Sequence, residues 1–177
     1  GWAAISTATA KPQGGIRTVL AIGSQGEYWE LEPLSTDERI GRIKNVRYAV
    51  RSTRSISDSL YLCGMGRTVM VRRGTGKWDD ISPNAATPPD QILGFEDLDG
   101  FSKEEIYAVG WQGEIWWYDN GRWRQIDSPV SANLNSIVCA DDGIAYVVGD
   151  DGAMIRGRKD EWHVLHTGRG ENLMDVA

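Results

Sequence analysis

The sequence contains few of the residues on which many enzymes and disulfide-rich secreted domains depend. Among its 177 residues are two histidines, two cysteines, two phenylalanines and six prolines. Because two cysteines without metal-type spacing build neither a disulfide framework nor a zinc site, we expect a reducing, cytoplasmic compartment. No apolar run approaches the roughly 18 residues of a membrane-spanning helix, and no basic start precedes an apolar stretch. We therefore expect neither a membrane partner nor a signal peptide.

Charge is unevenly distributed along the chain. The net charge of −6 argues against general nucleic-acid binding. Residues 1–88 hold 12 Lys/Arg and 8 Asp/Glu, whereas residues 89–177 hold 7 and 17. This asymmetry is compatible with ordinary solvated strand faces, and equally with a molecule that meets surfaces of opposite charge at its two ends.

What the sequence has in abundance is glycine and tryptophan, arranged in a repeat. Four segments share the pattern of a strand, a glycine turn and a second strand. They are "LAIGSQGEYWEL" from Leu20, "YLCGMGRTVMVR" from Tyr61, "YAVGWQGEIWWY" from Tyr107 and "YVVGDDGAMIRG" from Tyr146. Their common glycines, at positions 23, 64, 110 and 149, are 41, 46 and 39 residues apart. A period of about 40 to 45 residues is typical of a β-propeller blade.

Each period has room for two further strands. One precedes each repeat, in "WAAISTA", "IKNVRYAV", "QILGFED" and "LNSIVCA", and another begins near Trp78, Trp123 or Trp162. Since four short antiparallel strands make a blade, we predict an all-β propeller of about four four-stranded blades in one domain, residues 1–177. The blades are expected at residues 2–42, 43–90, 91–133 and 134–172, with 173–177 starting a further one.

The tryptophans are explained mainly by packing between blades. Ile115, Trp116 and Trp117 are adjacent, so both faces of their strand must be covered, as happens when blades stack face to face. Trp111 is different because it lies at the tip of a turn. Its ring either contacts a partner or folds back onto a neighbouring loop.

The turns resemble those of a known family. "GxxGxI" followed by "DNGRW" is similar to the repeats of BNR-type and YCF48-like propellers, whose blades often carry the Asp-box S-x-D-x-G-x-T-W. Asp119, Gly121 and Trp123 match a shortened Asp-box. The resemblance implies the propeller fold, but this family includes sialidases, lectins and assembly factors, so it implies no single function. Such rings usually have more than four blades. Either the chain is part of a larger ring, or self-association with a second chain completes it.

We find no arrangement of residues that predicts catalysis, a cofactor or a metal site. His163 and His166 would point to opposite faces of a strand, which makes them poor joint metal ligands. The stretch "FEDLDGFSKEE" at 95–105 has the composition of a calcium loop, but Phe95 and Ile106 occupy the first and last ligand positions of that motif. We expect an extended turn there instead.

The main functional prediction is a non-catalytic propeller that binds another protein. In this fold the turn after the second strand and the connections between blades share one face. The partner-binding residues expected on it are Trp111, Met65, Asp150, Asp127 and Arg169. Loops that vary on a uniform scaffold are where recognition usually occurs. A toxin-neutralising immunity protein of a bacterial toxin system is one concrete alternative.

Carbohydrate binding by a lectin-like propeller, or a glycoside-acting enzyme, is the other alternative. A propeller lectin would place an aromatic ring at the Trp111 position of every blade. The equivalent residues are Ser24, Met65 and Asp150, so a repeated sugar site is disfavoured while a single site stays open.

Overall fold

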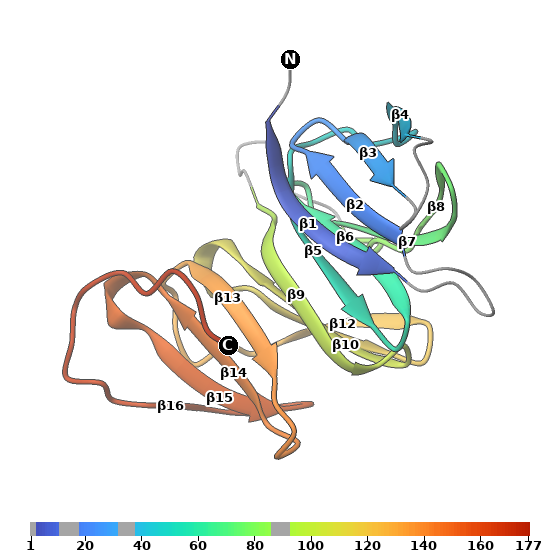
Figure 1. Cartoon of the computed structure of the whole chain (residues 1–177). Helices are drawn as coiled ribbons and strands as arrows, with labels where there is room; N and C mark the ends of the chain where they lie inside the picture. The colour runs from blue at the N-terminus through green and yellow to red at the C-terminus, as the bar shows by residue number, and fades with distance from the viewer. Residues whose placement is uncertain (1–2, 11–17, 32–37, 86–92) are drawn as a thin grey trace.

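The computed structural model describes residues 3–10, 18–31, 38–85 and 93–177 (Figure 1). These residues form sixteen strands in four antiparallel sheets of four strands each, which we call blades 1 to 4. They also form two one-turn 3-10 helices, η1 (Trp111–Gly113) and η2 (Asp150–Gly152). No helix in this described part of the chain has the length and apolar character needed to cross a membrane.

The strands follow one another in sequence order within each blade. Blade 1 contains β1 (Ala4–Ala10), β2 (Thr18–Gly23), β3 (Glu27–Leu31) and β4 (Glu38–Arg42). Blade 2 contains β5 (Val50–Ile56), β6 (Ser59–Gly64), β7 (Thr68–Gly74) and β8 (Lys77–Asp80). Blade 3 contains β9 (Phe95–Ser102), β10 (Glu105–Gly110), β11 (Ile115–Asp119) and β12 (Arg122–Ile126). Blade 4 contains β13 (Leu134–Cys139), β14 (Ala145–Gly149), β15 (Met154–Arg158) and β16 (Glu161–Val164).

The first strands of the four blades lie beside one another, β1 against β5, β5 against β9 and β9 against β13 (Figure 1). The remaining strands of each blade extend outward from this inner row. This is the arrangement of a β-propeller, and the predicted fold class of four four-stranded blades is confirmed. In the described residues the four sheets form an open array, and none of them closes on itself.

Two local predictions were wrong. The inner strand of blade 2 begins at Val50 rather than at Ile43, because Asn45 has a positive φ of 67° that interrupts the extended chain before it. The stretch that we expected to be an extended turn forms β9 through Ser102. Its acidic residues are explained by contacts with the neighbouring inner strands, as described below.

The glycines common to the repeats are required by close backbone approach. A Cβ atom added at Gly64, Gly110 or Gly149 would lie between 1.9 and 2.2 Å from a backbone carbonyl oxygen. The carbonyl oxygens belong to Ala49, Gly94 and Asn133. No side chain fits at such a distance, so blades 2, 3 and 4 each need glycine where the second strand ends beside the start of the first.

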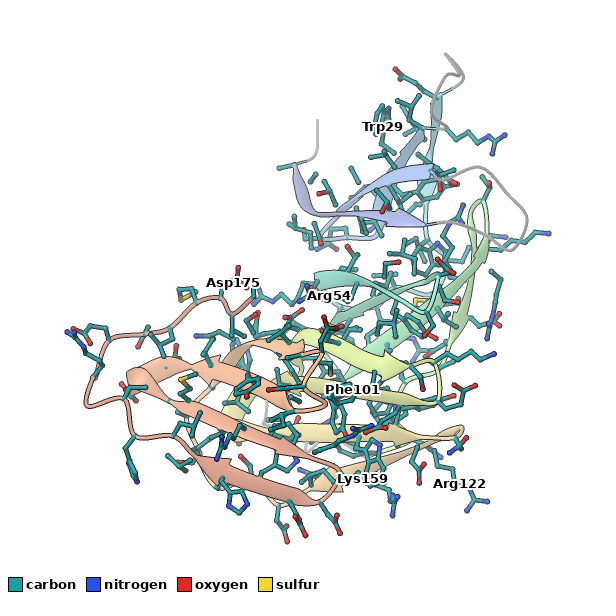
Figure 2. All side chains as sticks on the ribbon, turned by 60° about the horizontal axis from the view of Figure 1, so that its bottom comes forward. Trp29, Arg54, Phe101, Arg122, Lys159 and Asp175 are labelled. Atoms are coloured by element: carbon teal, nitrogen blue, oxygen red, sulfur yellow. The ribbon has the colours of Figure 1, made fainter. Side chains whose placement is uncertain are left out.

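The core consists of three apolar clusters, one between each pair of successive blades. Trp116 faces blade 2, whereas Ile115 and Trp117 face blade 4, which confirms that these adjacent residues are packed on both sides. Trp29 holds the position of Trp116 in blade 1, on the face that no other described blade covers (Figure 2). Its cross-strand neighbour Ile40 is 69% exposed.

Two buried ion pairs also join successive blades. Arg72 of blade 2 pairs with Glu30 of blade 1, and Arg67 of blade 2 pairs with Glu114 of blade 3. All four side chains are buried. Removing one partner of such a pair leaves a buried charge uncompensated and costs roughly 3–5 kcal/mol. These pairs therefore fix how neighbouring blades are stacked.

A similar hydrogen bond occurs at three places along the inner row of strands. A backbone N–H group of β5, of β13 or of the segment after blade 4 donates to a side-chain oxygen of β1, β9 or β13, respectively. The donor and acceptor pairs are Thr53 to Ser6 (3.2 Å), Ile137 to Asp97 (3.0 Å) and Val176 to Ser136 (3.4 Å). Residues 173–177 form no strand, but they lie beside β13 (Figures 1 and 2). Their position relative to β13 is similar to that of β13 relative to β9.

Candidate functional site

One face of the molecule, which we call the loop face, gathers the turns after the second strands and the connections between blades. Backbone hydrogen bonds join these two sets of segments. The Met65 N–H group donates to the Ala49 carbonyl oxygen (2.8 Å), and the Asp150 N–H group donates to that of Asn133 (2.9 Å). Each turn is therefore fixed to the connection that enters its own blade.

The loop face contains a groove beside blade 4. Its volume is about 580 Å³, which lies within the range of ordinary ligand pockets. Three segments form its walls, residues 129–132, 150–154 and 164–169. Val130, Met154 and Leu165 give it an apolar part, while Asp151 and Arg169 are exposed beside it. A protein segment that entered this groove would meet apolar surface surrounded by charge.

Two asparagines hold the walls of the groove in place. The Gln112 N–H group donates to the side-chain oxygen of Asn133 (3.0 Å), and the Asp151 N–H group donates to that of Asn172 (3.0 Å). Both pairs repeat at a spacing of 39 residues. Each asparagine ties the tip of a hairpin to the connection that leaves the same blade. The groove is therefore built before any partner arrives, which lowers the entropy cost of binding.

Glycines allow the same segments to approach closely. A Cβ atom at Gly113 would lie 2.1 Å from the carbonyl oxygen of Val130, and one at Gly152 would lie 2.1 Å from that of Arg169. Both glycines also have positive φ angles, of 75° and 70°. Any side chain here would push the connection away from the turn and alter the groove.

Asp150 is a structural part of the groove rather than a free carboxylate. Its two carboxylate oxygens accept hydrogen bonds from the side-chain amides of Asn133 (3.0 Å) and Asn135 (2.9 Å). Asp151, the next residue, is exposed and has a positive φ of 55°. A partner would therefore meet the charge of Asp151 more readily than that of Asp150.

Trp111 and Met65 are less accessible than their turn positions suggested. The Trp111 ring is half-buried, and its N–H group donates to the carboxylate of Glu96 on β9. Of the two expectations for this ring, the structure shows the one that folds back onto the protein. Met65 is only 7% exposed and packs against Gly94. Its side chain has little surface to offer a partner, because the connection before β9 covers it.

The five predicted site residues thus lie in different surroundings. Asp150 and Arg169 line the groove, and Asp127 is exposed at the start of the connection that forms one wall. Trp111 belongs to the turn that packs under that connection, whereas Met65 is buried in the turn of blade 2. Sequence reasoning missed Asn133 and Asn172. Their 39-residue spacing was the available signal.

The two cysteines are not activated as nucleophiles, and the two histidines lie at the surface. Burial raises the pKa of the Cys63 thiol and that of the Cys139 thiol, so both stay protonated at neutral pH. His163 and His166 are both exposed. In the described ranges, no three His, Cys, Asp or Glu side chains are grouped closely enough to hold a metal ion.

The chain is similar to a bacterial protein of known name. It is 39% identical over 149 residues to immune protein Tsi7 of Pseudomonas aeruginosa strain PAO1. The match covers 83% of this chain and 47% of that protein, so this chain spans about half the length of the relative. The sequence matches no known protein-family model.

Solved structures support the fold. The extracellular domain of a putative hybrid two-component system from B. thetaiotaomicron matches 96% of this chain and 23% of its own, with a TM-score of 0.68 and 13% identity. The computationally designed Ika8 protein matches 93% of this chain and 48% of its own, with a TM-score of 0.67 and 18% identity. YCF48 bound to D1 peptide matches 90% of this chain and 55% of its own, with a TM-score of 0.64 and 19% identity. The predicted likeness to YCF48 therefore holds for the fold, while the Asp-box resemblance stays a prediction.

Proposed function

We propose that this chain is an immunity protein, or part of one, that neutralises a bacterial toxin by binding it without catalysis. The observation that carries this proposal is the 39% identity to immune protein Tsi7. The chain covers 47% of that relative. Residues outside the chain can therefore also contribute to toxin neutralisation. Protein binding, our main prediction from the sequence, is the coarser form of the same function.

The groove beside blade 4 is the part of the chain that we assign to the toxin. Its walls are preorganised by Asn133 and Asn172, and it combines apolar surface with the exposed charges of Asp151 and Arg169. An apolar centre with a polar rim is the usual anatomy of a protein–protein interface. The solved complex of YCF48 with D1 peptide supports the idea that this fold accommodates a polypeptide ligand.

A competition experiment tests the proposal. A strain of the organism of origin that lacks the gene for this chain is grown on a surface in contact with its parent, and both are counted. We expect the parent to outgrow the deletion strain, because the parent delivers a toxin against which the deletion strain is unprotected. Restoring the gene should restore growth. Equal growth of parent and deletion strain would contradict the immunity function.

The assignment to the groove is tested with matched variants of the restored gene. Arg169→Glu reverses a charge beside the groove, whereas Arg122→Glu reverses an exposed arginine outside the groove, where β12 begins (Figure 2). We expect Arg169→Glu to protect poorly and Arg122→Glu to protect fully, with equal thermal unfolding midpoints. Full protection by Arg169→Glu would remove this arginine from the binding surface. Protection independent of every groove variant would place the interface elsewhere while leaving the immunity function intact.

Self-association to complete a ring stays a prediction. In a head-to-tail arrangement, β1 of a second copy would approach β13, where residues 173–177 already lie. That segment would have to move before two copies could close a ring. We therefore base the proposed function on the groove of one chain, and light scattering of the purified chain would measure its association state directly.

A further inference from the structure

A second cavity lies between blades 2 and 3, on the face opposite the loop face. Its volume is about 290 Å³. Its walls come from β6 and β7 of blade 2, from β11 of blade 3 and from the turns at that end of blade 3. Its lining residues include Ser59, Tyr61, Arg73, Lys103, Glu104 and Tyr118. The immunity function makes no use of this cavity.

Tyr61 is the unusual residue of this cavity. It is only 4% exposed, yet its hydroxyl has no hydrogen-bond partner in the part of the chain that the structure describes. Buried tyrosine hydroxyls almost always have one. The hydroxyl is not among the fully enclosed polar atoms, so the accessible remainder of this side chain opens into the cavity that it lines. A ligand or solvent in the cavity can therefore supply its hydrogen-bond partner.

The equivalent tyrosines of blades 3 and 4 have the hydrogen-bond partners that the Tyr61 hydroxyl lacks. In blade 3, Tyr107 holds the same repeat position, and its hydroxyl donates to Glu105 (2.8 Å) and accepts from the Lys159 N–H group (2.8 Å). In blade 4, the hydroxyl of Tyr146 donates to Asp142 (2.8 Å). Tyr61 alone among these three has an open cavity where the others have a protein partner. The repeat thus leaves this one position available to a ligand.

The charges around the cavity cancel locally. Arg73 pairs with Asp79 (2.7 Å), and the Lys103 ammonium lies 3.6 Å from the carboxylate of Glu104. Burial raises the pKa of Tyr61, so its hydroxyl is neutral at physiological pH. The hydroxyls of Ser59 and Tyr118 also have no hydrogen-bond partner within the described residues. Besides these charged pairs, the cavity therefore offers a ligand neutral hydroxyls beside an aromatic ring.

The cavity is held open by contacts between its two blades. The Trp123 ring N–H group donates to the carbonyl oxygen of Ile81 (2.6 Å), which joins blade 3 to the end of blade 2. Trp123 also packs against Tyr118, with 5.2 Å between ring centroids. Tyr118 is thereby fixed as one wall. A rigid wall of this kind needs little reorganisation to accept a flat apolar surface.

We propose that this cavity binds a single uncharged sugar ring. A sugar offers hydroxyls that can donate to and accept from Tyr61 and Ser59, and an apolar C–H face that can lie on the Tyr118 ring. The volume suits one ring rather than an extended chain. The balanced charges give an anionic ligand no advantage. This activity is separate from toxin binding, because the two sites are on opposite faces.

The test is saturation-transfer NMR of the purified chain with D-glucose, D-galactose and N-acetyl-D-glucosamine, each titrated in turn. We expect at least one to bind with a Kd of about 1 mM, as the small contact area implies. Tyr61→Phe should weaken binding about fivefold by removing one hydrogen bond while keeping the fold. Tyr118→Ala should abolish it. Tyr146→Phe, the same change at the equivalent position of blade 4, should leave it unchanged.

Two results would overturn the proposal. One is that none of the three sugars binds at concentrations well above the expected Kd. The other is that a sugar binds with equal affinity to wild type and to Tyr61→Phe, which would place it elsewhere on the surface. If Tyr118→Ala fails to fold, the sugar affinities of Tyr61→Phe and Tyr146→Phe still test whether the sugar binds in this cavity. The competition experiment above is unaffected by any of these outcomes.

Discussion

At the scale of single residues, Arg54 connects three blades. Its guanidinium donates to the Asp97 carboxylate (3.0 Å) and to the carbonyl oxygens of Leu98 and Ile137 (both 3.3 Å), and it lies near Asp175 (Figure 2). It therefore neutralises a buried acid of blade 3 while it holds blades 2, 3 and 4 at their inner edge.

We predict that Arg54→Ala lowers the free energy of unfolding by about 2 kcal/mol, because it leaves Asp97 buried without its cation. The partial exposure of Arg54 to solvent keeps the loss below that of a fully buried pair. Urea unfolding measures the change, with Arg122→Ala as the control at an exposed arginine. A loss no larger than that of the control would show that Arg54 does not hold the blades together.

Glu105 gives a second prediction at this scale, concerning pH. Its hydrogen bond with the Arg158 guanidinium lowers the pKa of the Glu105 carboxyl below its ordinary value of 4.5. Because the folded-state pKa is the lower one, the stabilisation is present above pH 4.5 and is lost as the pH falls through the lowered value. We expect Glu105→Gln to destabilise the chain at pH 7 by about 0.5 kcal/mol, a small effect because the pair is partly exposed.

The measurement is thermal unfolding of Glu105→Gln and wild type as a function of pH. The difference in unfolding midpoint should shrink as the pH is lowered from 5 towards 3, where the wild-type carboxyl is also neutral. A difference that stayed constant over this range would assign the effect to packing rather than to charge.

At the scale of structural elements, the repeat was predictable because it rests on glycines. Gly149 and its equivalents are needed where two strands of one blade approach within van der Waals distance. The number of residues between these glycines therefore gives the length of one blade in the sequence. The inner strand β9 could not be predicted as easily. The sequence pattern around Asp97 and Asp99 predicts a turn. The N–H groups and the arginine that bind these carboxylates come from neighbouring inner strands, which a local pattern does not show.

The close approach leads to a prediction for Gly149→Ala. The added Cβ atom would meet the Asn133 carbonyl oxygen at 2.1 Å, so β14 and the start of β13 must separate. We expect a loss of about 3 kcal/mol in the free energy of unfolding, at the upper end for an overpacked position. Gly74→Ala is the matched control, because nothing lies within 4 Å of its Cβ position. Equal stability of the two variants would refute the packing explanation for the repeat.

The candidate sites were predictable only in part, for a related reason. Asp150 and Arg169 could be placed on the loop face because turns and connections must share it. That Met65 is buried depends on how the connection before β9 runs, which no local pattern reveals. The free hydroxyl of Tyr61 could not be predicted either. The sequence has a tyrosine at the same position of three repeats, but it does not show which of the three hydroxyls lacks a protein partner.

At the scale of the whole molecule, four blades present two faces to which we assign separate functions. The loop face carries a preformed groove, and the opposite face carries a smaller cavity between blades 2 and 3. The inner hydrogen bonds and the buried ion pairs hold successive blades in register, so each site is built between rigid units. The acidic excess of residues 89–177 lies in the half that forms the groove, which favours a partner of complementary charge.

We assign protection against a toxin to the groove beside blade 4. The most direct test is survival, in contact with the parent strain, of a deletion strain that carries Ser131→Trp. This change fills the groove with a large ring, and Asp141→Trp adds the same ring on the opposite face. We predict that Ser131→Trp abolishes protection while Asp141→Trp retains it, at equal protein levels. Full protection by Ser131→Trp would contradict the claim.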